Sequence, residues 1–572
     1  MSNFNIDSIK ERTFDAIVIG SGISGGWAAK ELTQKGLKTL VLERGRDVKH
    51  VVDYPTTLKN PWEFEHLGTV PQEIKKDYQI ASNHYIFSES TLHFLVRDDE
   101  QPYIQDKPYS WIRGYQVGGR SLLWARQTQR WSDFDFEGPA RDGFAVDWPI
   151  RYKDLAPWYS YVEKFAGITG NKDGLDYLPD GEFLPPHEMS CVEKHFKQVV
   201  SQNYTNRHVI IGRAAHITEP KPIHLQQGRA KCQNRVICER GCPYGGYFSS
   251  NSSTLPWAEK TGKMTLRPHS VVHSIIYDEQ KGKATGVRVV DANNTKEMIE
   301  FYAKIIFVNA STLNSNMILL NSTSHRFPNG LGNDNDILGR YIAFHTSRGR
   351  ISAEYEGMLD STTDGRRPNI SYIPRFRNVY KQETDFLRGY AAGFTASRSP
   401  MQDFPNELGE SLKSHLNQQQ LGPWSIGSHM MGETIPKHES TVRLDATLKD
   451  KYGIPQLRAS VPFDDNDDKM LKDFHEQLGE MYRKAGFTNI KLIDTQRLPG
   501  NENHEMGGIR MGKDAKTSML NAWNQMHHCK NVFVTDGACM TSTATQNPSL
   551  TYMALTARAV DYAVKQLKAL KL

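Results

Sequence analysis

The chain has 572 residues and a mass of 65.0 kDa, which is room for two or more domains with sizeable cores. Its apolar content of 38% excludes wholesale disorder, and no stretch approaches the ~20 apolar residues that span a bilayer, so integral membrane proteins are excluded too. The 70 Lys and Arg residues against 65 Asp and Glu residues leave a net charge of +5, too weak and too evenly spread to favour nucleic acid as a partner.

The N-terminal part of the sequence predicts a βαβ unit. Residues 14–19 and 38–43 are short apolar runs rich in β-branched side chains, as in buried strands. A helix is expected over residues 26–34, where Ala, Lys, Glu and Leu occur, and Gly36 ends it. This order of elements implies a parallel sheet covered by helices.

Two later segments have the pattern of strands from the same sheet. Residues 303–310 and 531–536 are again short and apolar, and a long helix is expected after the second one, because apolar residues recur every three or four positions up to Leu567. Since hundreds of residues separate these strands, we expect long insertions that build a second domain, with the active site at the junction. The polar, Gln-rich residues 401–422 are expected to form a surface loop.

A glycine motif joins the first predicted strand to the first predicted helix. Gly20, Gly22 and Gly25 match G-x-G-x-x-G, in which the first glycine permits a tight turn, the second the approach of a pyrophosphate and the third close packing of the helix. The helix N-terminus then offers free N–H groups and a positive dipole end to phosphates. Glu43, at the end of the next strand, can accept hydrogen bonds from ribose hydroxyls. The motif predicts a nucleotide cofactor and leaves FAD and NAD both open.

The C-terminal region carries residues suited to alcohol chemistry. His504 can take a hydroxyl proton near neutral pH, and Asn547 can hold the same oxygen through its amide. Asp536 ends a predicted strand, where parallel sheets hold their ligands. A histidine on its own is more often a packed or surface residue, so the prediction depends on these residues together.

Taken together, these segments resemble the glucose–methanol–choline (GMC) family of flavin oxidoreductases nearly from end to end. The resemblance rests on GSGISG at 20–25, VLERG at 41–45, VGGRSLLW at 117–124, WPI at 148–150 with DLAPWY at 154–159, HEMGG at 504–508 and DGACMTSTATQNPSLT at 536–551. It implies an α/β fold, α+β overall, in which a Rossmann-like FAD-binding domain is interleaved with a sheet-plus-helix substrate-binding domain. The FAD-binding domain is expected over 12–55, 105–150, 225–350 and 495–572, and the substrate-binding domain over 56–104, 151–224 and 351–494.

The resemblance also implies roles for single residues. His504 matches the catalytic histidine of the family, and Asn547 matches the second catalytic position. The positions that it places against FAD are Asp536 and Gly537 for the pyrophosphate and ribityl chain, Val272 for the adenine, and Gly118, Gly119 and Ser121 for the isoalloxazine. Leu123 stands where relatives with covalent flavin carry a histidine, so non-covalent FAD is expected.

Three of the six cysteines are clustered. Cys232, Cys238 and Cys242 are spaced by six and four residues, and the glycine and proline around them indicate a loop in which three thiolates can converge. Thiolates suit zinc and iron–sulfur clusters, but a tetrahedral zinc site or a four-iron cluster needs a fourth ligand, and none lies nearby in the sequence. On spacing alone, three unligated thiols or one disulfide are equally open.

This spacing, which ends in Cys-Pro, resembles the insert in bacterial FAD-dependent sugar dehydrogenases. That resemblance implies a [3Fe–4S] cluster on the loop 231–243, which would pass electrons out of the flavin. Cys191, Cys529 and Cys539 are expected to be small buried residues.

These features predict an FAD-dependent dehydrogenase that oxidises a secondary alcohol of a sugar or glycoside. His504 would accept the hydroxyl proton, Asn547 would orient the oxygen, and the hydride would pass to flavin N5. Residues 307–315 and 504–512 resemble glucoside 3-dehydrogenases, which implies oxidation of a C3 hydroxyl of glucose or a glucoside to a 3-keto sugar. Gluconate, fructose and glucose C1 dehydrogenases of the same family stay open, as do an oxidase that uses O2 and a flavin electron-transfer subunit without alcohol chemistry.

The resemblance implies partners as well. Besides the sugar or glycoside, we expect a small accessory subunit and an electron-acceptor protein such as a cytochrome c. Residues 1–12 are polar and lack the apolar core of a secretory signal. A soluble protein is therefore expected, cytoplasmic, or periplasmic if it is exported with a partner that bears the signal.

Overall fold

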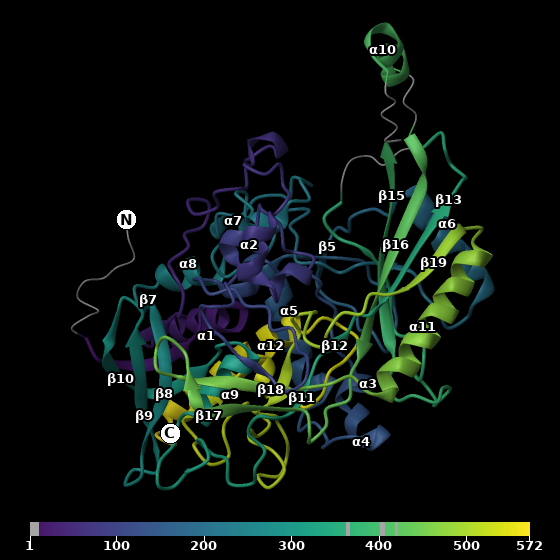
Figure 1. Cartoon of the computed structure of the whole chain (residues 1–572). Coiled ribbons are helices and arrows are strands. Elements are labelled where there is room, and N and C mark those ends of the chain that lie inside the picture. The colour runs from purple at the N-terminus through teal and green to yellow at the C-terminus, as the bar shows by residue number, and fades with distance from the viewer. Residues whose placement is uncertain (1–10, 362–366, 401–406, 418–420) are drawn as a thin grey trace.

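The computed structural model describes residues 11–361, 367–400, 407–417 and 421–572. Two sheets with their helices lie side by side, and a two-stranded arm projects from the second sheet (Figure 1). The fold is mixed α/β, as the sequence predicts.

The first sheet holds the glycine motif and is assembled from segments far apart in the sequence. Its parallel strands run in the order β7 (Met264–Arg267), β2 (Thr39–Leu42), β1 (Thr13–Ile19), β10 (Asn294–Val308) and β21 (Val532–Val534). The antiparallel strands β8 (Ser270–Asp278) and β9 (Lys283–Asp291) extend it from β10. The prediction that two late segments join the N-terminal βαβ unit is confirmed.

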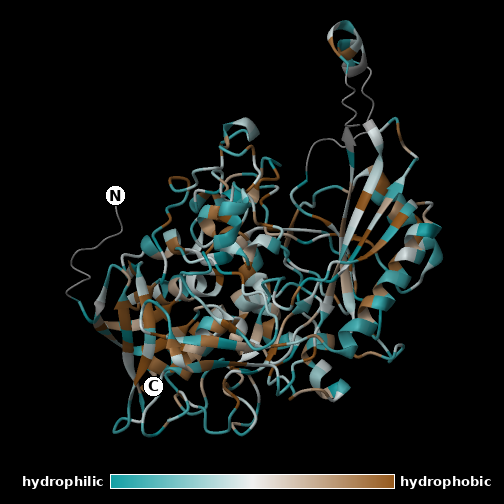
Figure 2. Ribbon diagram, viewed as in Figure 1, coloured by the Kyte–Doolittle hydropathy of each residue, from teal (hydrophilic) through white to brown (hydrophobic). Residues whose placement is uncertain are grey.

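Both faces of the parallel strands are buried, which explains their continuous apolar sequence. Val18 packs in one core with the helices α1 (Ile23–Gln34) and α12 (Ser549–Lys568), whereas Ile19 belongs to the core on the opposite face. Each such side chain contributes about 1.5–3 kcal/mol when fully buried. Figure 2 shows these strands as a brown, hydrophobic group.

The helices follow the predicted order with one shift at the glycine motif. The long C-terminal helix is present as α12, and its apolar side chains face the sheet. Helix α1 begins at Ile23, three residues before the predicted start at 26, because Gly22 is its N-cap and the motif itself forms the first turn.

The second sheet is mainly antiparallel. Its strands run in the order β19 (Thr488–Asp494), β13 (Gly349–Tyr355), β16 (Leu421–Glu433), β15 (Tyr390–Pro400), β14 (Ser371–Ile373) and β6 (Ile210–Ile211), and β12 (His345–Thr346) also pairs with β16. The helices α11 (Asp465–Lys484) and α6 (Cys191–Asn203) cover one face through a core that contains Phe474 and Phe196.

The long strands β15 and β16 continue into the arm, whose tip carries α10 (Gly409–Asn417) (Figure 1). The prediction of a surface loop over 401–422 is therefore wrong for α10 and for the start of β16, while 401–406 and 418–420 lie outside the described residues. Most described side chains of α10 are exposed. An exposed helix has a polar sequence, as a loop does, so the composition of this segment did not distinguish a helix from a loop.

The remaining elements are short. Small sheets are formed by β17 (Thr441–Lys449), β18 (Pro455–Ser460) and β3 (Ile104–Gln105), by β11 (Arg340–Ala343) and β20 (Met506–Gly508), and by β4 (Ile168–Thr169) and β5 (Phe183–Leu184). The other α-helices are α2 (Gln72–Lys75), α3 (Asp133–Phe136), α4 (Gly138–Asp142), α5 (Tyr152–Ala166), α7 (Pro222–Gln226), α8 (Thr254–Glu259) and α9 (Thr312–Leu320). Within the described ranges, no helix has the length and apolar character needed to cross a membrane. The chain passes between the two sheets several times. The exact domain boundaries therefore cannot be read from the sheets and stay a prediction.

Candidate active site

A cavity of about 540 Å³ brings together most of the residues predicted to form the site. One side is formed by the carboxyl ends of β1 and β2 with the start of α1, and the other side by β13, β14, β15 and β16. The predicted residues that line it are Gly20, Gly22, Glu43, Gly119, Ser121, Val272, His504, Asp536, Gly537 and Asn547. Five others, namely Gly25, Gly118, Cys232, Cys238 and Cys242, lie outside this lining. A volume of this size is typical of a cofactor or small-molecule site.

The three glycines of the motif serve different steric needs. Gly20 has φ +96°, and a Cβ there would lie 2.3 Å from the carbonyl oxygen of Asn309. A Cβ on Gly25 would lie 1.9 Å from the carbonyl oxygen of Gly20, so only glycine lets α1 pack on the turn. A Cβ on Gly22 would meet nothing within 4 Å, because this backbone faces the cavity.

The N-terminus of α1 is open toward the cavity. Gly22 is the N-cap and supplies no side chain to the first backbone N–H groups. Gly22, Ile23 and Ser24 all line the cavity. An anionic group placed there would meet free donors and the positive end of the helix dipole.

Glu43 lines the same end of the cavity, but both of its carboxylate oxygens already accept hydrogen bonds. Ser21 donates to it from its backbone N at 3.2 Å and from its hydroxyl at 2.5 Å, and the backbone N of Gly45 donates at 2.9 Å. Burial raises the pKa of the carboxyl above its ordinary value. Glu43 thus ties the glycine turn to the end of β2 in addition to its predicted contact with ribose.

The second loop, 117–124, lies directly against the glycine turn. A Cβ on Gly119 would be 3.4 Å from the Cα of Gly22, and the backbone N of Gly118, at φ +88°, donates to the hydroxyl of Ser21 at 3.0 Å. Ser121 caps this loop by donating to the carbonyl of Gly118 at 2.6 Å. Gly118 therefore stabilises the loop from outside the cavity lining, through its hydrogen bond to Ser21, while Gly119 and Ser121 border the cavity.

Asp536 occupies the end of β21. Its carboxylate accepts from the hydroxyl of Ser315 at 2.5 Å and from the backbone N of Ala538 at 3.0 Å. Burial raises the pKa of Asp536 to about 6. Val272, on β8, lines the same cavity as Glu43, and its contact with an adenine stays a prediction.

His504 is held between two side chains. Its Nε2 lies 3.4 Å from the amide nitrogen of Asn547, and its Nδ1 lies 2.9 Å from Nδ1 of His345. The other ring nitrogen of His345, Nε2, lies 2.5 Å from the carbonyl oxygen of Ala544. His504 and Asn547, which are 43 residues apart in sequence, are therefore brought together at the cavity wall.

The carbonyl of Ala544 determines where the protons of both imidazoles lie. A carbonyl only accepts, so Nε2 of His345 carries a hydrogen, and Nδ1 of the neutral ring is the acceptor. Nδ1 of His504 must then donate to it, which leaves Nε2 of His504 without a hydrogen, so that this atom is an acceptor. The amide nitrogen of Asn547 can donate to this acceptor at 3.4 Å, and a bound alcohol that takes the place of Asn547 can give its proton to the same lone pair.

Both rings are held in the neutral form. Burial lowers the pKa of His345 to about 4. Burial, and then repulsion from the neighbouring His345, Arg120 and His84 when these carry charge, hold the pKa of His504 well below its ordinary value of 6.5. The base is therefore unprotonated at neutral pH.

Sequence reasoning missed several residues around His504. Besides His345, Arg120 reaches Glu505 at 2.8 Å and the hydroxyl of Ser311 at 2.9 Å. Arg120 and Glu505 stand inside the segments 117–124 and 504–508 but were given no role, and His345, on the two-residue strand β12, has no motif around it. Their contacts with the segment after 503 join parts of the chain that are hundreds of residues apart.

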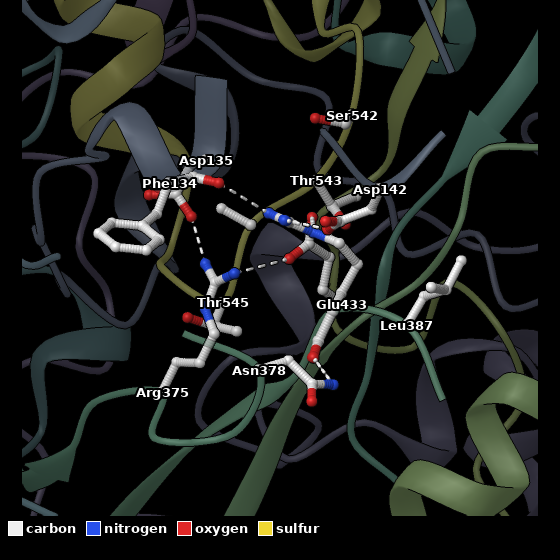
Figure 3. Close-up of polar contacts among 12 residues, drawn as sticks. Phe134, Asp135, Asp142, Arg375, Asn378, Leu387, Glu433, Ser542, Thr543 and Thr545 are labelled. Carbon is white, nitrogen blue, oxygen red and sulfur yellow. Dashed lines mark hydrogen bonds and ion pairs between the residues drawn. The ribbon is translucent and has the colours of Figure 1, made fainter. Parts of the chain in front are cut away.

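A buried ion network, with Asp135, Arg375 and Glu433 labelled in Figure 3, reaches the residue that precedes Asn547. Arg375 donates to Asp135 and lies 3.6 Å from Glu433, which lies 2.9 Å from Arg388. Asp135 also accepts from the amide of Gln546 at 3.2 Å. The network therefore ties α3, the second sheet and the residue next to Asn547 to one another.

The cysteine loop is compact but is not arranged as a single-ion site. All three thiols are free, and Cys238 Sγ lies 3.8 Å from Nε2 of His216. Each of the three thiols interacts electrostatically with the other two, and burial raises the pKa of Cys238 to about 11. Across the described ranges, no group of three or more His, Cys, Asp or Glu side chains is placed to hold a metal ion. The predicted cluster thus finds no support in this geometry.

The other three cysteines differ from one another. Cys529 and Cys539 are fully buried, as predicted. Cys191 is only half-buried at the start of α6, so the prediction is wrong there.

The nucleotide end of the cavity fits FAD. Asn309 Oδ1 and the hydroxyl of Tyr552 are buried in its wall without a hydrogen-bond partner among the described residues, which is expected of groups that await a polar ligand. Helix α12, like α1, begins at the cavity without a side-chain cap. Two positive helix ends and unsatisfied polar groups suit a flavin with a pyrophosphate.

Comparison with known proteins agrees with this geometry. The N-terminal family model described as GMC oxidoreductase matches residues 14–346, and the C-terminal model of the same description matches residues 436–556. The two matches include every predicted site residue and His345.

The chain is also similar over nearly its full length to characterised enzymes. It is 28% identical to 2-methyl-1,2-propanediol dehydrogenase of Mycolicibacterium austroafricanum, over 96% of this chain and 94% of the relative. It is 25% identical to the fructose dehydrogenase large subunit of Gluconobacter japonicus, over 97% and 98%. It is 25% identical to the gluconate 2-dehydrogenase flavoprotein of Pantoea cypripedii, over 95% and 92%.

Proposed function

The chain belongs to the GMC oxidoreductase family of FAD enzymes that act on the CH–OH groups of alcohols and sugars, and on this premise we propose that it is a sugar dehydrogenase. The proposed reaction oxidises a secondary hydroxyl of a sugar or glycoside, at C3 of glucose or a glucoside, to a 3-keto sugar. The observation that carries this proposal is the unprotonated Nε2 of His504, an acceptor beside the Asn547 amide in the cavity wall.

His504 acts as the base. Its Nε2 accepts the hydroxyl proton, because Nδ1 already carries the hydrogen that it donates to His345. The positive charge that forms on His504 is stabilised by the same hydrogen bond. Asn547, 3.4 Å from Nε2, turns its amide toward the alcohol oxygen and orients it.

FAD supplies the acceptor for the hydride of the alcohol carbon. The residues that would hold it are the glycine turn with Gly22, the ends of β2 and β21 with Glu43 and Asp536, and the second loop with Gly119. Leu123 offers no side-chain atom for a covalent bond, so we propose that FAD is bound non-covalently.

The C3 position is proposed from sequence similarity. Residues 307–315 and 504–512 resemble glucoside 3-dehydrogenases. The test is turnover of methyl glucoside by the FAD-loaded protein, followed by NMR of the product. A 3-keto glucoside supports the proposal, whereas a lactone from free glucose, a 2-keto acid from gluconate or a 5-keto sugar from fructose would assign it to another sugar dehydrogenase.

We also propose that Cys232, Cys238 and Cys242 hold a three-iron cluster. The spacing of the three cysteines, which resembles the insert of FAD-dependent sugar dehydrogenases, is the ground for it, and three-iron clusters bind each thiolate to a different iron, so they need no single point of convergence. A cluster there would give electrons an exit toward an accessory subunit or an acceptor protein such as a cytochrome c. Iron analysis with electron paramagnetic resonance tests this, with Cys191→Ser as the matched control for Cys238→Ser. Zinc, or no metal in anaerobically purified protein, would contradict it.

A further inference from the structure

One arginine of the cavity differs from the others that line it. The other four each have a carboxylate partner: Arg44 with Asp450 at 3.4 Å, Arg113 with Asp98 at 3.3 Å, Arg120 with Glu505 at 2.8 Å and Arg126 with Glu239 at 2.7 Å. The guanidinium of Arg350 makes no hydrogen bond or ion pair with any of the residues that the structure describes. A half-buried cation without a partner is costly, which marks this position.

The second sheet points Arg350 into the cavity. Residues alternate between the faces of β13, and Ile351 and Ala353 pack in the core under α11. Arg350 therefore lies on the opposite face, directly across from His429 of β16. Gly393 of β15 leaves room for the His429 ring, since a Cβ there would lie 2.4 Å from it. Arg350, His429 and Gly393 all line the cavity.

The charges around Arg350 leave a net positive field. Its charged neighbours are Glu502 and Arg497, and these two lie 3.6 Å from each other. One carboxylate thus faces two guanidiniums. His429 adds no charge, because burial lowers its pKa to about 3.

The phosphates of FAD are not the missing partner. The nucleotide end of the cavity is formed by the glycine turn, Glu43 and Asp536, whereas the groups that interact electrostatically with Arg350 are Glu502, Arg497 and Tyr85. An anion at Arg350 must therefore belong to the other occupant of the cavity, which is the substrate.

We propose that Arg350 binds the carboxylate of an anionic sugar, so that the preferred substrate is a sugar acid or a glycoside of one. This inference rests on the proposed function. A carboxylate fits the planar fork of a guanidinium with two parallel hydrogen bonds. In a glycoside of glucuronic acid the carboxylate is carried on C5, two ring bonds from C3, so the C3 hydroxyl and the carboxylate point away from the ring in different directions and can contact His504 and Arg350 separately.

A matched pair of substrates tests the proposal. Methyl glucuronide and methyl glucoside differ only at C6, and kcat/KM is measured for each with the FAD-loaded protein and an artificial one-electron acceptor. The glucuronide should be preferred by about 10- to 100-fold, the range for a hydrogen-bonded charge pair, mostly through KM. Arg350→Met should remove this preference, and Arg350→Lys should keep part of it. Lys491→Met, which removes a charge from the neighbouring strand β19 outside the cavity lining, should keep all of it.

Other outcomes overturn the proposal or assign the failure elsewhere. A wild-type preference for the neutral glucoside, or an equal loss with both sugars in Arg350→Met, would overturn it. A glucoside 6-phosphate preferred over the glucuronide would contradict a carboxylate site. If neither sugar reduces the flavin, the proposed function fails. The anion site is then tested separately, by calorimetry of glucuronide binding to the wild type and to Arg350→Met. Glucuronide binding that is lost in Arg350→Met supports it, and unchanged binding overturns it.

Discussion

At the scale of single residues, the proton positions around His504 are set by one backbone carbonyl. Ala544 accepts from His345, His345 accepts from His504, and the lone pair of His504 is thereby directed at the cavity. No charged residue is needed to select this tautomer. His345 is a positioning residue in this account, because it acts on the base and does not line the cavity.

Two substitutions of His345 separate this role from simple packing. Glutamine can present a carbonyl oxygen to Nδ1–H of His504, whereas leucine cannot. We expect His345→Leu to slow flavin reduction by sugar about 100-fold or more, as when a general base is misplaced, and His345→Gln to stay within about tenfold of the wild type. Stopped-flow reduction without O2 measures both. Equal rates in the two variants would remove His345 from the mechanism.

The lowered pKa of His504 predicts an unusual pH profile. The base works when unprotonated, and burial keeps it so below its ordinary pKa of 6.5. The rate of flavin reduction should therefore stay flat as the pH falls through 6.5 and decline only in more acid buffer. A decline centred at 6.5 would show that the imidazole is not desolvated.

The sequence identified the reacting pair and missed its support for a physical reason. His504 and Asn547 lie in segments with a recognisable order of residues. His345 is a lone histidine on a two-residue strand, and its contact with His504 spans 159 positions. Arg350 also lies outside every sequence motif, since only the pairing of β13 with β16 places it in the cavity.

At the scale of elements, the turn from β1 to α1 carries the cofactor site through close backbone packing. Gly25 allows α1 to touch the turn, and Gly22 leaves space on the cavity side. The pattern of glycines predicts these two functions from sequence alone. The predicted helix start at 26 was three residues too late. The helix begins at Ile23 because the glycine motif, and not the helix-forming residues after it, makes the first turn.

Two alanine substitutions should separate these functions. Gly25→Ala puts a Cβ 1.9 Å from a carbonyl oxygen, so the turn must move, and both stability and FAD binding should be lost. Gly22, at φ −64°, meets no atom within 4 Å. Gly22→Ala should therefore unfold within about 0.5 kcal/mol of the wild type but bind FAD at least about tenfold more weakly. Denaturant unfolding and FAD titration measure the two effects. Unchanged FAD affinity in Gly22→Ala would place the cofactor elsewhere.

At the scale of the whole molecule, the buried ion network joins the two halves of the fold behind the active site. Arg375 and Arg388 come from the second sheet region, Asp135 comes from α3, and Gln546 precedes Asn547. Charged residues that lie far apart along the chain give no sequence pattern, so the apolar strands, the long C-terminal helix and the glycine turn could be predicted but this junction could not.

Removing one member of this network should be costly. Arg375→Met leaves Asp135 and Glu433 buried without it, and breaking a buried pair costs about 3–5 kcal/mol. The pair Lys565–Asp561, at 2.7 Å on α12, is the control, because Lys565 is exposed and Asp561 keeps a second partner in Lys35 at 3.1 Å, and Lys565→Met should cost less than about 1 kcal/mol. Denaturant unfolding of both variants gives the comparison. Similar unfolding midpoints for both would mean that the network does not hold the halves together.

The central claim is that a flavin lies within reach of the sugar carbon whose hydroxyl His504 deprotonates. Anaerobic mixing of the FAD-loaded protein with methyl glucoside and methyl glucuronide, followed by the visible flavin band, tests it most directly. The account predicts rapid bleaching in the wild type, and in His504→Ala the same bound FAD but reduction slowed by about 100- to 10,000-fold. Bleaching at the wild-type rate in His504→Ala, or no bleaching of the wild type by any sugar, would contradict it.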